Sequence, residues 1–509
     1  MNSSVKKLLH NIFANQLGFL VSVVVTFFLS PFVVNSLGGT RYGIWSLIVS
    51  LTGNYGLLAF GIQGAMTRYI AHATVTNDRE RVNGYFNTAL SFLLCSAALT
   101  IIVGLVVSLF IDTIFVLPKD LVKEARAACV LVTFSAAATF AFAAFDSVLV
   151  AHQRFQLINV VGTVITLIRA GMTVWILKQG YGIVALAALG TGLALFNGLL
   201  VAAVAKRIYS WLRFSFPLAR RSYFKELINY GYKSFTVGVA VVLIYQCDLL
   251  IIGTYLPPDK VTTYSLAATL ITYLIQFFST AVSTFTPFST ELHAKNNIED
   301  LRKFFLFGSC VMYMFGGIVV AGCIIWGRAF FTLWVSPEYG ESATILTILI
   351  IPQFFSTGAR VGSSLLAGMA NVGSLAVAVL CQGICNLFLS LFLIRYFGII
   401  GVAIGTLVPL IISDGIWLPL YVARVINVKY GSIYFKSMLP GIGISLLGVI
   451  LGYFMREAFP PVSWSMFVFD TTVVSCCCLV VSYIIIARSS VDNVFKSVFT
   501  KVKSNLVIR

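Results

Sequence analysis

The sequence predicts an all-α membrane protein with about 14 transmembrane helices. Of its 509 residues, 59% are hydrophobic and only 10% are charged, against roughly 45–50% and 25% in soluble proteins. The mean hydropathy is +0.94. Because a membrane-spanning helix uses about 20 apolar residues, this composition suffices for about 14 spans. An ordinary soluble enzyme is excluded.

Apolar runs of spanning length follow one another along the chain with only short connections. Six runs precede a basic stretch at 206–225: 10–36, 41–70, 83–111, 125–150, 155–177 and 181–205. Eight follow it: 227–255, 261–290, 303–327, 342–369, 372–394, 397–423, 434–456 and 462–487. The second run contains a polar interruption, Thr52-Gly53-Asn54-Tyr55. The connections leave no room for a soluble catalytic domain.

The distribution of Lys and Arg predicts the orientation. With a cytoplasmic N-terminus, one side of the membrane receives 23 of the 35 basic residues and the other side receives 9. Cytoplasmic loops carry an excess of Lys and Arg, so both termini are predicted to be cytoplasmic. The net charge of +17 does not indicate nucleic acid, because the basic residues are scattered over short connections. The N-terminus resembles a retained first span, since no small-residue cleavage site follows it.

Two pairs of similar segments indicate an internal repeat. Thr40–Leu47 resembles Thr262–Ala268, and Gly182–Ala187 resembles Gly398–Ala403. An even number of helices separates the copies, which predicts two six-helix lobes in a parallel pseudo-repeat. Such repeats place a substrate site between the halves. The predicted parts are a first lobe at 1–206, a basic linker at 207–226, a second lobe at 227–424, and two further helices with a cytoplasmic tail at 425–509.

The sequence offers no enzymatic motif. It has neither a phosphate-binding loop nor a paired His/carboxylate helix motif. Most of its 10 cysteines lie in apolar runs without the spacing of a zinc site. We therefore expect no catalytic residue, no metal and no cofactor.

Polar and ionisable residues inside the predicted spans are the candidate functional residues, because each is costly in lipid unless it is paired or hydrated. We expect an anionic substrate to bind Arg169 and Arg360, with Lys233 and Asn15 as further candidates. Two acidic residues, Asp248 and Asp414, are candidates for coupling to a proton or a cation. For each charge, pairing with another buried charge stays an open alternative. Lys233 could instead extend to the interface, and Asn15 could bond a neighbouring helix.

Several segments, in order and spacing, resemble the polysaccharide-transporter branch of the multidrug/oligosaccharidyl-lipid/polysaccharide exporter superfamily. These segments are Ser30–Phe32 through Gly38, Tyr42–Leu47, Gly61–Arg68, Tyr245–Gly253, Leu365–Asn371 and Gly398–Gly405. They cover both halves of the chain. The family has no strict catalytic signature that would assign site residues.

The resemblance implies a 14-helix flippase. It would move a polyprenyl-pyrophosphate-linked oligosaccharide from the cytoplasmic to the periplasmic leaflet of the bacterial inner membrane, for O-antigen, capsule or exopolysaccharide assembly. Its implied partners are membrane lipids, a polysaccharide polymerase and chain-length machinery. By analogy with the lipid II flippase, the last two helices would border a groove for the prenyl tail. The alternative is a cation-coupled multidrug antiporter of the same superfamily. The usual 12 helices of those antiporters argue against it.

Overall fold

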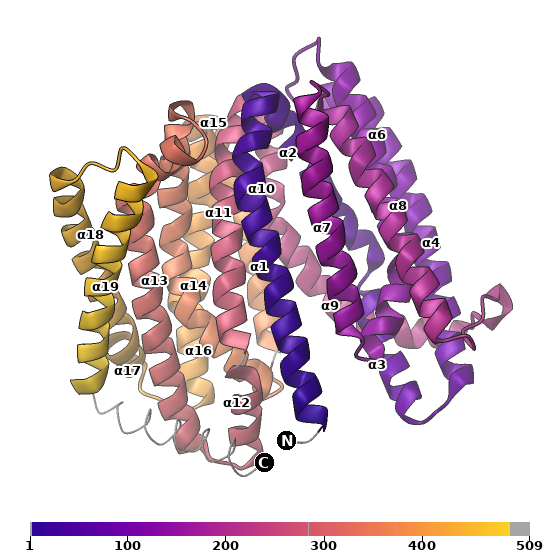
Figure 1. Ribbon diagram of the computed structural model, residues 1–509. Coiled ribbons are helices and arrows are strands. Elements are labelled where there is room, and N and C mark those ends of the chain that lie inside the picture. Colours follow the sequence, from indigo (N-terminus) through magenta and orange to yellow (C-terminus); the bar gives the residue numbers. More distant parts are fainter. Residues whose placement is uncertain (1–2, 284, 372, 489–509) are drawn as a thin grey trace. The chain divides into compact units, whose positions relative to one another are not determined.

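The computed structural model describes residues 3–283, 285–371 and 373–488, and every regular element in these ranges is helical (Figure 1). Eleven helices are long and apolar enough to cross a membrane, or up to 13 if each of two bent pairs counts as one span. The prediction of an all-helical membrane protein is therefore confirmed, while the count of 14 stays a prediction.

One candidate span is long enough for two crossings. Gly373–Val425 comprises 53 residues, which as a helix would measure about 80 Å against a hydrocarbon core of about 30 Å. Gly398 interrupts it with φ 57° and ψ −137°. Gly398 is the second residue of the apolar run predicted at 397–423, so the break lies close to the predicted boundary between this run and the one at 372–394.

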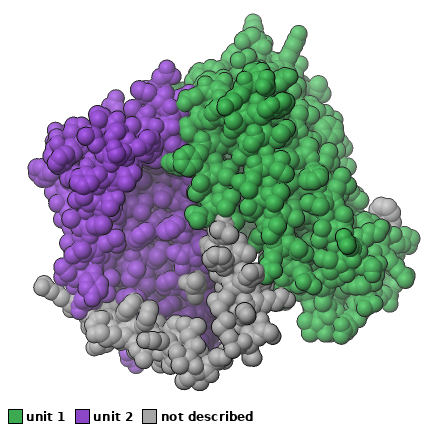
Figure 2. Space-filling model, in the orientation of Figure 1, with its two compact units in different colours: residues 1–262 green, residues 263–509 purple. Residues whose placement is uncertain are grey.

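The chain divides into two compact units, Met1–Thr262 and Thr263–Arg509, which Figure 2 colours separately. Within unit 1, α6 packs against α4 and α8, and α1 packs against α7. Its helices are α1 (Ser3–Leu37), α2 (Gly39–Tyr55), α3 (Ile62–Val75), α4 (Arg79–Leu109), α5 (Ile111–Ile114), α6 (Val122–Ala151), α7 (Phe155–Lys178), α8 (Ile183–Ile208), α9 (Arg221–Tyr245), α10 (Cys247–Tyr255) and the start of α11 (Pro258–Ser283).

The polar interruption in the second apolar run precedes a break in the helix. After α2 the chain forms a 3-10 turn, Gly56–Ala59, and α3 continues at an angle of 49°. Gly61, at the break, has φ 67°, and a Cβ atom there would lie 2.5 Å from the carbonyl oxygen of Gly231. Glycine is needed at this position because it adopts the left-handed region without strain and lets α9 approach closely.

The first pair of segments predicted to be repeat copies, Thr40–Leu47 and Thr262–Ala268, begin close to each other, and the contacts between their starts lie within unit 1. The Thr262 hydroxyl donates to the carbonyl oxygen of Gly39 over 2.6 Å. The Thr40 hydroxyl donates to the Asp259 carboxylate over 2.9 Å. A Cβ atom at Gly43 would lie 1.9 Å from the carbonyl oxygen of Pro258. The starts of α2 and α11 are therefore in backbone contact.

In unit 2, α13 is the central helix and packs against α14 and against the C-terminal pair α18 and α19 (Figure 1). The helices are α12 (Phe285–Ala294), α13 (Ile298–Trp334), α14 (Ser342–Gly368), α15 (Gly373–Leu410), α16 (Leu418–Val425), α17 (Tyr430–Ile433), α18 (Leu439–Ala458) and α19 (Trp464–Arg488). Two π-helical turns, η4 (Ile411–Trp417) and η5 (Tyr434–Met438), join α15 to α16 and α17 to α18.

Candidate functional site

A polar cluster lies inside unit 2, between α14 and η4. Ser356 and Arg360 are four residues apart on α14 and so share one face of that helix. The buried Ser356 hydroxyl donates to the Asp414 carboxylate of η4 over 2.5 Å. Because π-helical turns occur frequently at functional sites, the position of Asp414 in one marks the cluster as a candidate site.

Arg360 is the cation of this cluster. Its Nη1 donates to the Ser279 hydroxyl of α11 over 2.9 Å. Its Nε is buried and has no hydrogen-bond partner among the described residues. Arg360 attracts Asp414 electrostatically, without a direct ion pair in the described part of the chain. A buried donor without an acceptor costs about 1–3 kcal/mol, so the Arg360 guanidinium has capacity for an anion.

Tyrosine side chains hold both parts of the cluster, two of them at η4 and one at α14. The Tyr434 hydroxyl donates to the carbonyl oxygen of Gly415 over 2.6 Å, and the Tyr430 hydroxyl donates to that of Tyr434 over 2.8 Å. Tyr313 of α13 is almost completely buried, and a Cβ atom at Gly358 would lie 2.1 Å from its ring. Close packing of α13 on α14 therefore holds the helix that carries Ser356 and Arg360.

The other predicted site residues lie in unit 1. Arg169 is an exposed residue of α7, and no described carboxylate forms an ion pair with it. Asp248 is buried in α10. Lys233 lies where α9 bends by 42°; its side chain and that of Asn15 fall outside the described part of the structure. Among the predicted residues whose side chains the structure describes, Arg360 and Asp414 share one cluster, and the roles of the whole predicted set stay predictions.

The sequence did not reveal Ser279, Ser356 or Tyr434 as members of the cluster. Ser356 could have been noticed because it lies one helical turn before Arg360. Its contact with Asp414 joins residues 58 positions apart, and nothing in the sequence indicates such a pairing. In the described residues, no group of three or more His, Cys, Asp or Glu side chains could hold a metal ion.

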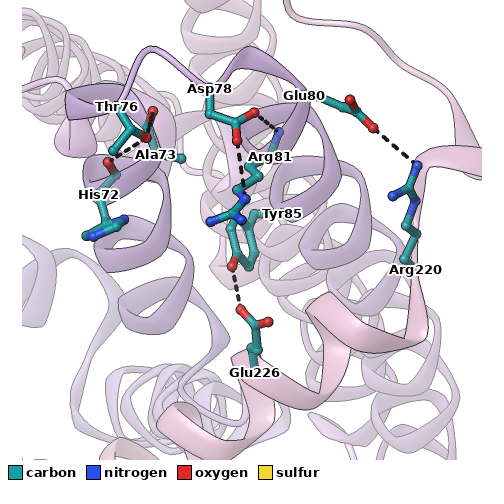
Figure 3. Close-up of polar contacts among 9 residues, drawn as sticks. All are labelled: His72, Ala73, Thr76, Asp78, Glu80, Arg81, Tyr85, Arg220 and Glu226. Atoms are coloured by element: carbon teal, nitrogen blue, oxygen red, sulfur yellow. Dashed lines mark hydrogen bonds and ion pairs between the residues drawn. The ribbon is translucent and has the colours of Figure 1, made fainter.

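The basic stretch between α8 and α9 is fixed to α4. The side-chain amide oxygen of Asn83 accepts from the backbone N–H of Arg213 over 2.7 Å, and that of Asn87 accepts from the backbone N–H of Ser215 over 2.9 Å. Figure 3 shows two further contacts with α4, an ion pair from Arg220 to Glu80 and a hydrogen bond from Tyr85 to the carboxylate of Glu226, which lies on α9. This linker is therefore a docked segment of unit 1.

Comparison with known proteins identifies the family. Residues 8–293, more than half of the chain, match the family described as "Polysaccharide biosynthesis protein". The chain belongs to this family. It is also similar to the uncharacterized membrane protein EpsK of Bacillus subtilis (strain 168), with 23% identity over 521 residues that cover 97% of this chain and 98% of EpsK. The family resemblance inferred from the sequence is confirmed.

Solved structures show the same fold. The lipid II flippase MurJ, in an inward closed conformation, matches with a TM-score of 0.69 and 14% identity, covering 94% of this chain and 99% of MurJ. An inward-facing multidrug resistance MATE transporter of the MOP superfamily matches with a TM-score of 0.65 and 14% identity, over 80% of this chain and 96% of the transporter. The chain is thus a multi-pass membrane protein of the polysaccharide biosynthesis family with a MurJ-like and MATE-like fold.

Proposed function

We propose that this protein is a flippase for a polyprenyl-pyrophosphate-linked oligosaccharide, which it moves from the cytoplasmic to the periplasmic leaflet by alternating access. The family supports a role in polysaccharide biosynthesis, and the fold supports transport. The single observation that carries the substrate class is the buried, unsatisfied Nε of Arg360. O-antigen, capsule and exopolysaccharide assembly are the processes that would use such a substrate.

The chemistry of the cluster suits a pyrophosphate. The planar guanidinium of Arg360 can donate two parallel hydrogen bonds to phosphate oxygens. Arg169, and Lys233 at the bend of α9, would supply further positive charge from unit 1. The sugar head group needs hydration and fixed charge, whereas the isoprenoid chain stays in hydrocarbon.

Asp414 would couple the cycle to an ion. With the substrate absent, its carboxylate is the anion that Arg360 attracts. When a pyrophosphate binds Arg360, the negative charge of Asp414 is no longer balanced by this arginine. A proton or a cation that binds Asp414 can then balance its charge. Asp248, buried in unit 1, is the second candidate for this role.

The test is complementation of a deletion strain with an Arg169→Gln/Arg360→Gln double variant. We expect normal membrane insertion, loss of surface polymer and accumulation of the lipid-linked oligosaccharide. The matched control is Arg207→Gln, which removes an exposed charge at the end of α8 and should leave export unchanged. Wild-type polymer levels in the double variant would refute the role of the two arginines.

The MATE-like fold favours one second candidate, a cation-coupled multidrug antiporter. That function predicts altered drug sensitivity in the deletion strain, with normal surface polymer and no accumulated intermediate. The same strains therefore distinguish the two functions.

A further inference from the structure

An apolar groove of about 780 Å³ lies in unit 2, between the first half of α15 and η4. Its volume is typical of a ligand pocket. One wall carries Val377, Cys381 and Cys385, which recur at helical spacing on α15. The other wall carries Val408, Ile412 and Trp417. Among the described residues that line this α15 groove, none is charged.

The walls of the α15 groove are apolar and exposed. The groove lies within the candidate span Gly373–Val425, at a depth where the surroundings of a lipid-facing helix are hydrocarbon. Two residues on opposite walls, Val377 and Ile412, are 62% and 55% exposed. Large apolar side chains this exposed on a membrane helix indicate contact with lipid. A lipid chain can therefore enter from the side.

One end of the groove has the character of a membrane interface. Trp417, which lines it, stacks on Tyr421 with ring centroids 5.2 Å apart and an interplanar angle of 6°. The Tyr421 hydroxyl donates to the Asn371 side chain over 3.1 Å. Trp and Tyr concentrate at the level of the lipid head groups. The groove thus runs from the interface into the hydrocarbon region, as a lipid chain does.

The groove shares η4 with the Arg360 cluster. Ile412 and Ser413 face the groove, whereas the next residue, Asp414, bonds Ser356 on the α14 side. An apolar site and an anion site consequently lie on two faces of one π-helical turn in the same unit.

We propose that the α15 groove binds the isoprenoid chain of the lipid-linked substrate while Arg360 binds its pyrophosphate; this rests on the proposed function. The uncharged lining offers nothing to a phospholipid head group at the groove itself. It fits a lipid whose chain and head are bound at separate places. The groove lies on α15 and η4, and not on the two C-terminal helices that the resemblance suggested for the tail.

Photo-crosslinking tests this proposal. The full-length protein in phosphatidylcholine vesicles would be irradiated with a polyprenyl phosphate that carries a diazirine in its chain. We expect labelled peptides from 373–389 and 408–417. Ala378→Phe, which fills the groove, should lower this labelling at least tenfold, because each displaced methylene contributes about fourfold to binding. Ala376→Phe, on the same helix but outside the lining residues, is the matched control and should label like the wild type.

Two outcomes would overturn the proposal. Equal labelling of these peptides by a diazirine phosphatidylcholine, without competition from the polyprenyl phosphate, would show a groove for bulk lipid. Isoprenoid labelling confined to other helices would show that the chain binds elsewhere. Neither outcome contradicts the flippase function, which is tested separately by the lipid-linked intermediate in the deletion strain. The thermal stability of both phenylalanine variants would be measured to confirm that they are folded.

Discussion

Gly43→Ala tests the contact between the starts of α2 and α11. The new methyl group would lie 1.9 Å from the Pro258 carbonyl oxygen and 2.9 Å from the Thr262 hydroxyl. Ordinary contact begins near 3.4 Å, so the two segments must separate by about 1.5 Å. Backbone atoms cannot rotate away as a flexible side chain can. The separation would also break the hydrogen bond from Thr262 to Gly39.

The magnitude follows from three contributions. Overpacking costs about 1–3 kcal/mol, and the lost hydrogen bond about 1 kcal/mol. Alanine has a higher helix propensity than glycine, which offsets about 1 kcal/mol of this destabilisation. We therefore expect a net destabilisation of about 1–3 kcal/mol, which for a unit of this size lowers the melting temperature by about 2–12 °C.

The assay is thermal unfolding of the purified protein in detergent, together with surface polymer in the complemented deletion strain. Gly64→Ala is the matched control, because a Cβ atom at this position of α3 meets nothing within 4 Å. That control should be as stable as the wild type or more stable. If Gly43→Ala unfolds at the same temperature as Gly64→Ala, the inferred backbone contact is wrong.

Three further predictions concern acidic residues. Asp414→Asn keeps an acceptor for Ser356 but removes the charge, so export should fall about tenfold at normal protein levels; unchanged export would exclude Asp414 from coupling. Asp470 is fully buried in α19, and neither of its carboxylate oxygens has a hydrogen-bond partner among the described residues. Asp470→Leu should therefore raise the free energy of unfolding by about 1–3 kcal/mol. A lower melting temperature of this variant would show that the carboxyl group makes a stabilising contact. The hydrogen bond from Arg126 lowers the pKa of Asp112, between α4 and α6, below its ordinary value of 3.8. The stabilisation that ionised Asp112 contributes is complete above pH 3.8 and is lost as the pH falls through the lowered pKa. The melting temperatures of the wild type and of Asp112→Asn should therefore differ at pH 6 and converge below pH 3. A difference that stays constant with pH would contradict this reasoning.

The helices were predictable from the sequence because the thickness of the bilayer sets the length of each apolar run. The polar residues around Asn54 were recognised as an interruption of such a run, but the break in the helix after α2 was not predicted from them. The boundary near Gly398 was predicted to within a few residues, although the positive φ of this glycine was not. These features depend on residues close together in the chain, which is why local patterns reveal them.

The candidate site was only partly predictable. The sequence identified Arg360 and Asp414 because a charge inside a span is conspicuous. It did not show that they share a cluster, since their contacts join segments more than 50 residues apart. The α15 groove was not predictable either. An apolar helix face has the same composition whether it meets lipid, a neighbouring helix or a bound chain, so Val377 and Ile412 carry no local signal of a groove.

The most direct test of the flippase function is the transbilayer location of the lipid-linked oligosaccharide in the deletion strain. The intermediate would be labelled in sealed vesicles of known orientation, from strains that carry wild-type protein, the Arg169→Gln/Arg360→Gln variant or no protein. We predict that the intermediate accumulates in the cytoplasmic leaflet in the last two strains and reaches the periplasmic leaflet with the wild type. Normal polymer with no accumulated intermediate, or an intermediate already in the periplasmic leaflet without the protein, would contradict the proposed function.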